Sequence, residues 1–301
     1  MCAEPNDGTL RPRPRLAAFA AVSLWGLSFV ATKTALRDVS PVTLIFSRFA
    51  LGLAVLFTIL KLRRQLLTPP PSMWPMLALM GFVGVFVHQM LQAHALKLTT
   101  AVRTGWLIGL IPIWSVVLAV IFLGERLGPR LTFGLLLGAI GALLVITRGE
   151  LSLRVLSLPA TRGDLLILAS TVNWAIYSVI GRRTLKALGS GRATAFSILA
   201  GWAMIVPFFL LSAGWRDYRC LSTTGAISIL FLGIGCSGVA YLLWYVALEH
   251  LETARVAVFL YVEPLVTVTA ALLLLGEPIL VTTIVGGLLV LAGVFFVQKN
   301  S

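Results

Sequence analysis

Long apolar runs follow one another along this chain, and short breaks that carry Lys and Arg separate them. Each run has about the 17–25 residues that an α-helix needs to cross roughly 30 Å of hydrocarbon. Hydrophobic residues make up 58% of the chain and charged residues 12%, against about 45–50% and about 25% in soluble domains. The runs are continuous, unlike the alternating pattern of a membrane barrel. The sequence therefore predicts an all-α integral membrane protein.

The runs predict ten transmembrane helices in two sets of five, with a more polar stretch between the sets. The predicted helices cover 16–36, 41–60, 73–95, 99–123 and 131–148, then 164–185, 194–214, 223–248, 254–275 and 279–298. The predicted organisation is an N-terminal tail at 1–15, a first repeat at 16–148, a polar linker at 149–163 and a second repeat at 164–299.

The two sets of five are related in sequence by a shift of 152 positions. The matched pairs are Arg103 with Arg255, Pro112 with Pro264, Glu125 with Glu277, Gly134 with Gly286, and Gly141 with Gly293. Because five is odd, the second set must enter the membrane from the opposite side. The repeats are therefore predicted to be inverted, an organisation typical of secondary transporters with a site near the bilayer midplane.

The formal net charge of +13 comes mainly from loop cations. With the N-terminus inside, the inner segments carry 14 Lys and Arg and the outer segments carry 8. This bias predicts a multi-pass protein with both termini cytoplasmic. The expected location is the plasma membrane, with a bacterial inner membrane favoured. The same pattern predicts contact with anionic lipid and no nucleic-acid partner.

Several motifs resemble the EamA-type family of the drug/metabolite transporter superfamily. They are WGLSFVATKTAL at 25–36, FSRFALGL at 46–53, ALKLTTAVRTGWLIGLIPIW followed by LGERL in the first set, and ALEHLETARVAVFLYVEPLV followed by LGEP in the second. The resemblance spans about residues 16–298. It implies ten helices around a central cavity, and it implies small-metabolite substrates, often moved outward.

Two charges inside the runs have no twin in the other half. Glu263 stands opposite Ile111, and Arg48 stands opposite Ile198. A carboxylate at the bilayer centre costs about 2.5–3.5 kcal/mol on insertion scales, so it needs a wet cavity, a partner or a proton. Two interpretations of Glu263 are open: a neutral, hydrogen-bonded prop of the bend, or a cavity group that binds substrate or carries a proton.

Arg48 and Glu263 are expected to differ by about 7 Å in depth. They could pair with each other or bind the two ends of a zwitterion such as an amino acid. The alternative for Arg48 is a structural role at a helix end or a headgroup.

Polar and aromatic side chains are predicted to line the cavity, because aromatic walls around a few polar groups suit small amphipathic ligands. The predicted substrate-binding residues are Glu263, Arg48, Trp25, His88, Gln92, Asn173, Trp174, Tyr177, Tyr241 and Trp244. The alternative for the aromatic residues is interface anchoring or helix packing.

Features present in both halves are predicted to serve the fold. Prolines bend helices by removing a backbone donor. The residues predicted to be structural are Pro112, Pro264, Glu125 and Glu277, and Arg103 and Arg255 are expected to snorkel from helix starts.

Enzymatic activity is not predicted. The chain has no P-loop and no HExxH, and its three histidines do not make a metal site. We expect no cofactor and no metal, so uphill movement must use a gradient. Proton antiport through Glu263 is one hypothesis, and facilitated diffusion needs no titrating group.

The predicted function is secondary transport of small metabolites, with amino acids or their derivatives favoured, by alternating access and in the direction of export. A multidrug or cation exporter, an uptake permease of the same fold and a channel-like carrier remain alternatives. The expected partners are the substrate, protons and membrane lipid, and a homodimer is left open.

Overall fold

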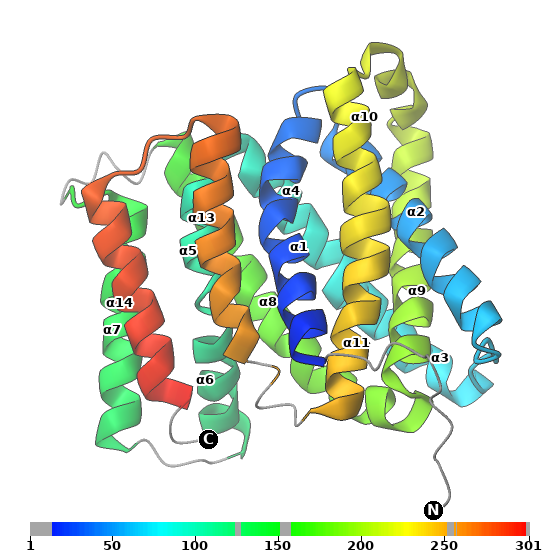
Figure 1. Cartoon of the computed structure of the whole chain (residues 1–301), viewed down its shortest axis with the longest axis horizontal. Coiled ribbons are helices and arrows are strands. Elements are labelled where there is room, and N and C mark those ends of the chain that lie inside the picture. Colours follow the sequence, from blue (N-terminus) through cyan, green and yellow to red (C-terminus); the bar gives the residue numbers. More distant parts are fainter. Residues whose placement is uncertain (1–13, 124–127, 151–157, 252–255, 257, 299–301) are drawn as a thin grey trace, which may run out of the picture.

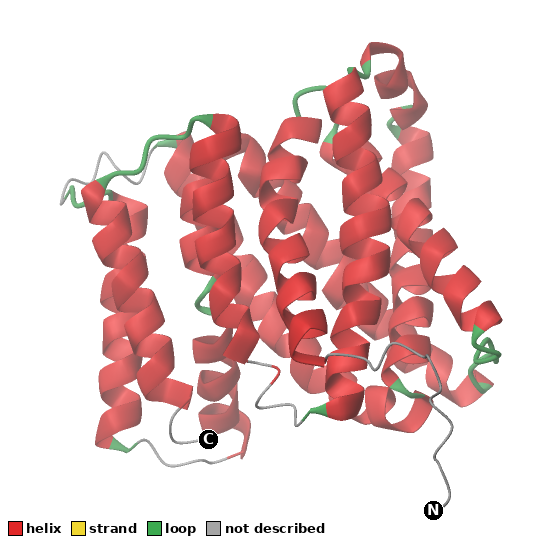
Figure 2. Ribbon diagram, viewed as in Figure 1, coloured by secondary structure: helices red, strands yellow, loops and turns green. Residues whose placement is uncertain are grey.

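The computed structural model describes residues 14–123, 128–150, 158–251, 256 and 258–298. Within these ranges the chain forms helices joined by short loops, and no strand occurs (Figure 2). The predicted all-α class is therefore confirmed for this part of the chain. Six helices in it are long and apolar enough to cross a membrane by length and composition, and four shorter apolar helices of 10–17 residues accompany them.

The first half of the chain contains three long spans followed by shorter helices. Its elements are α1 (Pro14–Ala35), α2 (Pro41–Leu62), η1 (Pro71–Met73), α3 (Trp74–Gly81), η2 (Phe82–Val87), α4 (His88–Leu98), α5 (Ala101–Ile108), α6 (Ile111–Leu123) and α7 (Pro129–Thr147). A proline opens α2 and α7, where its fixed φ suits the first helical position and its missing N–H costs nothing.

The second half has the same order of long and short helices. Its elements are α8 (Pro159–Leu188), α9 (Ser190–Leu211), η4 (Gly214–Cys220), α10 (Thr223–Leu230), η5 (Phe231–Val239), α11 (Ala240–His250), η6 (Val258–Tyr261), α13 (Val262–Leu275) and α14 (Val281–Gln298). Pro159 opens α8 inside the stretch predicted as the linker at 149–163, because proline suits a helix start. Likewise, α1 begins inside the predicted tail at 1–15.

The structure differs from the sequence prediction at the fourth and ninth runs. The predicted helix at 99–123 is broken at 109–110, between α5 and α6. The described part of 254–275 opens with the 3-10 turn η6 before α13 begins. Pro112 and Pro264 lie just after these interruptions, each without the N–H that would continue the ladder. The bend expected in the first half is therefore a break.

The third and eighth runs both contain a π-helical segment. One is η2, and the other is η5. A shift of 152 positions moves η2 from 82–87 onto 234–239, which lies inside η5. Segments of this kind are rare and are frequently found at functional sites. Their presence at matched positions is a structural counterpart of the sequence repeat.

Helices α7 and α14 lie side by side at one edge of the molecule (Figure 1) and meet at glycines. A Cβ atom placed on Gly141 would lie 2.5 Å from the carbonyl oxygen of Gly286, and one on Gly293 would lie 2.6 Å from that of Gly134. Small residues let membrane helices approach this closely. Gly134 and Gly286 are sequence counterparts, as are Gly141 and Gly293. Gly141 thus contacts the counterpart of Gly134, and Gly134 contacts the counterpart of Gly141. This reciprocal pairing is the contact pattern of a two-fold interface.

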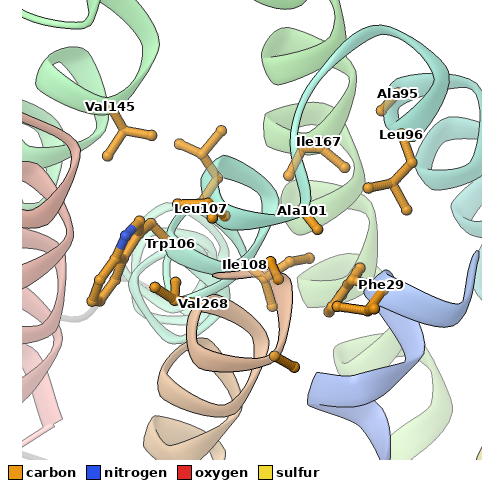
Figure 3. Close-up of a cluster of buried hydrophobic side chains, with 14 of the residues drawn as sticks. Phe29, Ala95, Leu96, Ala101, Trp106, Leu107, Ile108, Val145, Ile167 and Val268 are labelled. Atoms are coloured by element: carbon orange, nitrogen blue, oxygen red, sulfur yellow. The ribbon is translucent and has the colours of Figure 1, made fainter. Parts of the chain in front are cut away.

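Buried apolar side chains from both halves surround α5 (Figure 3). Phe29 of α1, Val145 of α7, Ile167 of α8 and Val268 of α13 belong to this cluster. Because lipid tails are as apolar as these side chains, close packing holds such helices together. The cluster fixes α5, and with it the break at 109–110.

The two ends of the bundle differ in the elements that reach them. Helix α1 begins and α14 finishes at the lower end in Figure 1, which we call the N-terminal end. Helices α1 and α13 finish at the opposite end, which we call the distal end, and α5 begins there.

Candidate substrate cavity

A cavity of about 100 Å³ lies between the two halves, where the break of α5–α6 and the junction of η6 with α13 meet α1, α2, α4 and α8. Ile108, Gly109, Leu260 and Tyr261 contribute the wall at the two helix interruptions. Its other lining residues are Trp25, Ser28, Phe29, Arg48, His88, Gln89, Gln92, Ile111, Pro112, Trp174, Tyr241, Glu263, Pro264, Leu291 and Val294. Seven of the ten predicted substrate-binding residues are in this wall.

Arg48 is buried on α2 and is held from both halves of the chain. Its Nε donates to Ser237 Oγ at 3.0 Å, and its Nη1 donates to Gln89 Oε1 at 3.1 Å. The guanidinium also lies 5.3 Å from the ring centroid of Phe49. Among the described residues, these bonds use two of its five N–H donors. The remaining donors are available to a ligand or water at the cavity.

Glu263 lies in the cavity wall at the start of α13. Among the described residues, its carboxylate makes no hydrogen bond and no ion pair, and only its backbone oxygen is bonded, by Thr267 Oγ1 at 2.9 Å. A structural prop would need side-chain partners, because a buried polar group without them is costly. The geometry therefore favours the cavity interpretation of Glu263.

His88 and Trp174 form one side of the wall. His88 Nδ1 lies 3.1 Å from the carbonyl oxygen of Ser170, and its ring is 4.8 Å from that of Trp174. The contact fixes the His88 ring through α8. A histidine bonded in this way serves helix packing as well as the cavity surface.

Trp25 and Tyr241 form another part of the wall. The Trp25 Nε1 donates to the carbonyl oxygen of Cys236 at 3.2 Å, and its ring packs edge-on against Tyr241 at 5.4 Å. Cys236 belongs to the π segment η5, whose irregular backbone leaves this oxygen within reach. The aromatic surface is thus supported by the helix that carries Tyr241.

The structure does not bring three of the predicted residues to the cavity. Asn173 Nδ2 donates to the carbonyl oxygen of Val83 at 2.7 Å, and Trp244 packs on the ring of Trp25 at 5.3 Å. Tyr177 packs against Trp174 with the two rings tilted and their centroids 5.0 Å apart. All three are absent from the residues that line the cavity. Asn173 and Trp244 find these partners on neighbouring helices and Tyr177 on its own helix α8, so all three support packing.

A polar cluster joins the two halves at the distal end. Lys33 Nζ lies 3.2 Å from Glu277 Oε1 and also donates to the Thr99 carbonyl oxygen. The two Glu277 oxygens accept from the backbone N–H groups of Ala101 and Val102, at 3.1 and 3.0 Å. A carboxylate is favourable at a helix N-terminus. Glu277, predicted to be structural in its own turn, caps α5 of the other half.

The same cluster contains a buried ion pair between Arg103 and Asp164. Thr99 Oγ1 donates to Asp164 Oδ1 at 2.5 Å, and Arg103 Nη2 donates to the Ile146 carbonyl oxygen at 2.6 Å. The expectation that Arg103 snorkels is wrong, because its partner lies inside the bundle. Sequence reasoning missed Asp164, although an acid at the start of an apolar run was a usable signal.

Two sequence counterparts of this cluster cannot be compared with it. Glu125 and Arg255 lie outside the residues that the structure describes. Their predicted roles, as a structural group and as a snorkelling arginine, stay predictions.

The long apolar helices and the cavity between them define the class as a multi-pass membrane protein. The model of the EamA-like transporter family matches residues 14–147 and 161–298. The chain belongs to this family.

Two similar proteins are also named as a transporter or an exporter. An uncharacterized transporter from Archaeoglobus fulgidus is 32% identical over 90% of this chain and 92% of that protein. A probable terminal-alkyne amino-acid exporter from Streptantibioticus cattleyicolor is 26% identical over 93% of this chain and 91% of that protein. A solved crystal structure of a protein shares the fold, with a TM-score of 0.68 and 23% identity over 97% of this chain and 100% of that chain.

Proposed function

We propose that this chain exports small zwitterionic metabolites, amino acids or their derivatives, across the plasma membrane by alternating access. The observation that carries the proposal is that Arg48 and Glu263 line one cavity, with free donors on the first and a carboxylate without a described partner on the second. Arginine binds carboxylates in a fork geometry, and a carboxylate binds an ammonium group. The two charges suit opposite ends of an amino acid.

The aromatic wall would hold the side chain of such a substrate. Trp25, Trp174 and Tyr241 provide flat apolar surface beside the two charged groups. Ligand sites commonly combine mostly apolar walls with a few polar groups that fix orientation. The printed name of the Streptantibioticus relative, an amino-acid exporter, supports the same substrate class.

The architecture we propose is ten spans in two inverted five-helix repeats. The matching of the family model to two separate segments supports it, as do the paired π segments and the exchange of glycine contacts between α7 and α14. Rocking of one repeat against the other would expose the cavity to each side in turn. With both termini cytoplasmic, as the loop cations favour, the distal end is the outer end.

The distal cluster fits the role of an outer closure. Lys33 and Arg103 come from the first repeat, and Glu277 and Asp164 come from the second. Opening this end by separating the repeats would break both ion pairs.

Proton coupling through Glu263 completes the proposal. The carboxylate would carry a proton in one direction and release it when the substrate ammonium group binds. Facilitated diffusion is the alternative, in which Glu263 binds substrate and exchanges no proton with it.

The test is flux into proteoliposomes that contain the purified protein, with amino acids, nucleosides and lipophilic cations, with and without a pH gradient. We expect an amino acid to move, Arg48→Gln to abolish its transport, and Glu263→Gln to abolish the gradient-driven part. Trp244→Phe, behind the wall, is the matched control and should retain transport. Normal amino-acid flux in both charge variants would contradict the proposal.

A second candidate function is export of lipophilic cations. The specific observation in its favour is the combination of Glu263 with the Trp25 and Tyr241 rings, because aromatic faces attract cations. The same panel separates the two functions. A cation exporter needs Glu263 but not Arg48, so Arg48→Gln would leave cation flux intact.

A further inference from the structure

A cationic surface lies at the N-terminal end of the bundle, where α2 finishes and α8 passes to α9. We call it the basic rim. Its residues are Lys61, Arg63, Arg64, Arg183, Lys186 and Arg192. All are exposed except Arg192, which is half-buried.

The two parts of the basic rim are joined by direct contacts. Arg192 donates from Nε and Nη2 to the carbonyl oxygen of Leu67, at 3.2 and 2.9 Å. A Cβ atom placed on Gly191 would lie 3.6 Å from Leu60 Cδ2. The start of α9 therefore rests on the end of α2, and Arg192 lies beside the cations of α2.

Long stretches of the chain around the rim contain no acidic residue. The sequence has no Asp or Glu from residue 39 to 124, nor from 165 to 216. These ranges contain α2, α3, α4 and α9 entire, with most of α8; α11, which also contacts α9, lies outside them. The helices that carry the rim therefore offer it no carboxylate from these ranges.

The backbone conformation of Arg64, just after α2, is a second observation that points to a role for this cationic residue. Arg64 has φ 55°, in the left-handed region that favours glycine. A glycine at this helix end would adopt the conformation at less cost. Strained positions held by a side chain of specific chemistry are candidates for function.

Exposed apolar side chains lie beside the cations. Leu62 is 77% exposed, Leu67 62% and Trp74 37%. A soluble anion would leave these side chains in water, whereas an amphipathic partner would cover both kinds of surface. Tryptophan is also enriched at the level of lipid headgroups.

We propose that the basic rim is a binding site for anionic phospholipid, with the phosphate between the end of α2 and the α8–α9 corner and the acyl chains against Leu62 and Leu67. Arginine forks and lysine ammonium groups are the usual partners of phosphate. The site is independent of the substrate cavity, so it stands whichever substrate the protein moves.

The distal end offers a matched control surface. Arg216 and Arg219 are also exposed there, but Asp217 and Asp38 accompany them. Asp217 Oδ2 accepts from the Ser40 backbone N–H at 2.9 Å. Because acids are interleaved with these cations, they should not bind an anionic headgroup.

The experiment is native mass spectrometry of the detergent-solubilised full chain titrated with phosphatidylglycerol or phosphatidylcholine. We expect phosphatidylglycerol to bind more tightly. The triple variant Lys61→Gln/Arg63→Gln/Arg64→Gln should lose on the order of 100-fold in affinity, from about fivefold per cation. The control Arg216→Gln/Arg219→Gln should bind as the wild type does.

Two further measurements test whether the binding depends on charge and whether it is specific to lipid. The charge-retaining variant Lys61→Arg/Arg63→Lys/Arg64→Lys should bind phosphatidylglycerol, which separates loss of charge from loss of folding. Inorganic phosphate and a short oligonucleotide should not displace the lipid. Equal binding of the two lipids, unchanged binding by the triple variant, or displacement by either soluble anion would each overturn the proposal.

Discussion

Arg103 and Asp164 form a buried ion pair that joins the first half of the chain to the second. The pair is supported by Thr99 and by the carbonyl oxygen of Ile146. Both side chains are almost fully buried, at 4% and 0% exposed. Two charges removed from water are tolerated only with such close partners, and each depends on the other.

Removing one member of this pair should cost more than removing both. Asp164→Asn leaves the Arg103 charge buried and uncompensated, for which we expect about 3–5 kcal/mol of destabilisation. Arg103→Gln in the Asp164→Asn background should restore part of that stability. Thermal unfolding of the four proteins in detergent measures the coupling. Additive effects would show that the pair does not act as a unit.

Glu277 should act mainly as a helix cap. Glu277→Ala removes both acceptors from the N-terminus of α5 and the partner of Lys33, so we expect a loss of about 1–2 kcal/mol. Glu277→Gln retains one acceptor and should lose less. Lys33→Met removes the ion pair and the bond to the Thr99 carbonyl oxygen but leaves the cap, and is the control. If Lys33→Met destabilises as much as Glu277→Ala in the same unfolding assay, the contacts of Lys33 and not the cap dominate.

Ser237 and Gln89 should control the orientation of Arg48. Each accepts one hydrogen bond from the guanidinium, worth about 1.5–3 kcal/mol for a charged donor. If Arg48 binds substrate, Ser237→Ala should raise the KM for transport about tenfold or more while the protein remains folded. Ser228→Ala, in the same span and bonded to its own helix, is the control. An unchanged KM would remove Ser237 from the site.

The sequence predicted features that follow from simple chemistry over long stretches. Apolar runs predicted the helical class, and the loss of a donor at Pro112 predicted an irregularity in its helix. Glu263 and Arg48 were identifiable because a charged residue in an apolar run is costly unless it has a wet cavity, a partner or a proton. The partners of Arg48 were not predictable, since Ser237 and Gln89 are ordinary polar residues until the fold brings three helices together.

Packing also explains why some of the predicted site residues lie away from the cavity. Asn173 and Tyr177 share a helix face with Trp174, and periodicity alone could not tell which of them reaches the cavity. The π segment η2 carries Val83, whose carbonyl oxygen binds Asn173. No local pattern in the sequence indicated that π segment.

The glycine contacts between α7 and α14 should not tolerate larger residues. In Gly141→Leu, the new Cβ would lie 2.5 Å from the backbone oxygen of Gly286, so the helices must separate. We expect at least the 1–3 kcal/mol typical of overpacking. Gly128→Ala is the control, because a Cβ there meets nothing within 4 Å. Thermal unfolding compares the two, and equal stability would contradict the close helix contact.

Asp217, which lies at the distal end, should make the stability of the protein depend on pH. Burial raises the pKa of its carboxyl, but hydrogen bonds from Ser40 and Thr43 and the charge of Lys97 outweigh that effect, so the pKa lies below its ordinary value of 3.8. A carboxyl whose folded pKa is lowered contributes stability above its unfolded pKa, and the contribution is lost as pH falls through the folded pKa. Wild type should therefore lose stability relative to Asp217→Asn as the pH is lowered below about 4. Melting temperatures of the two proteins across that range measure the difference. Parallel curves would mean that Asp217 makes no such contribution.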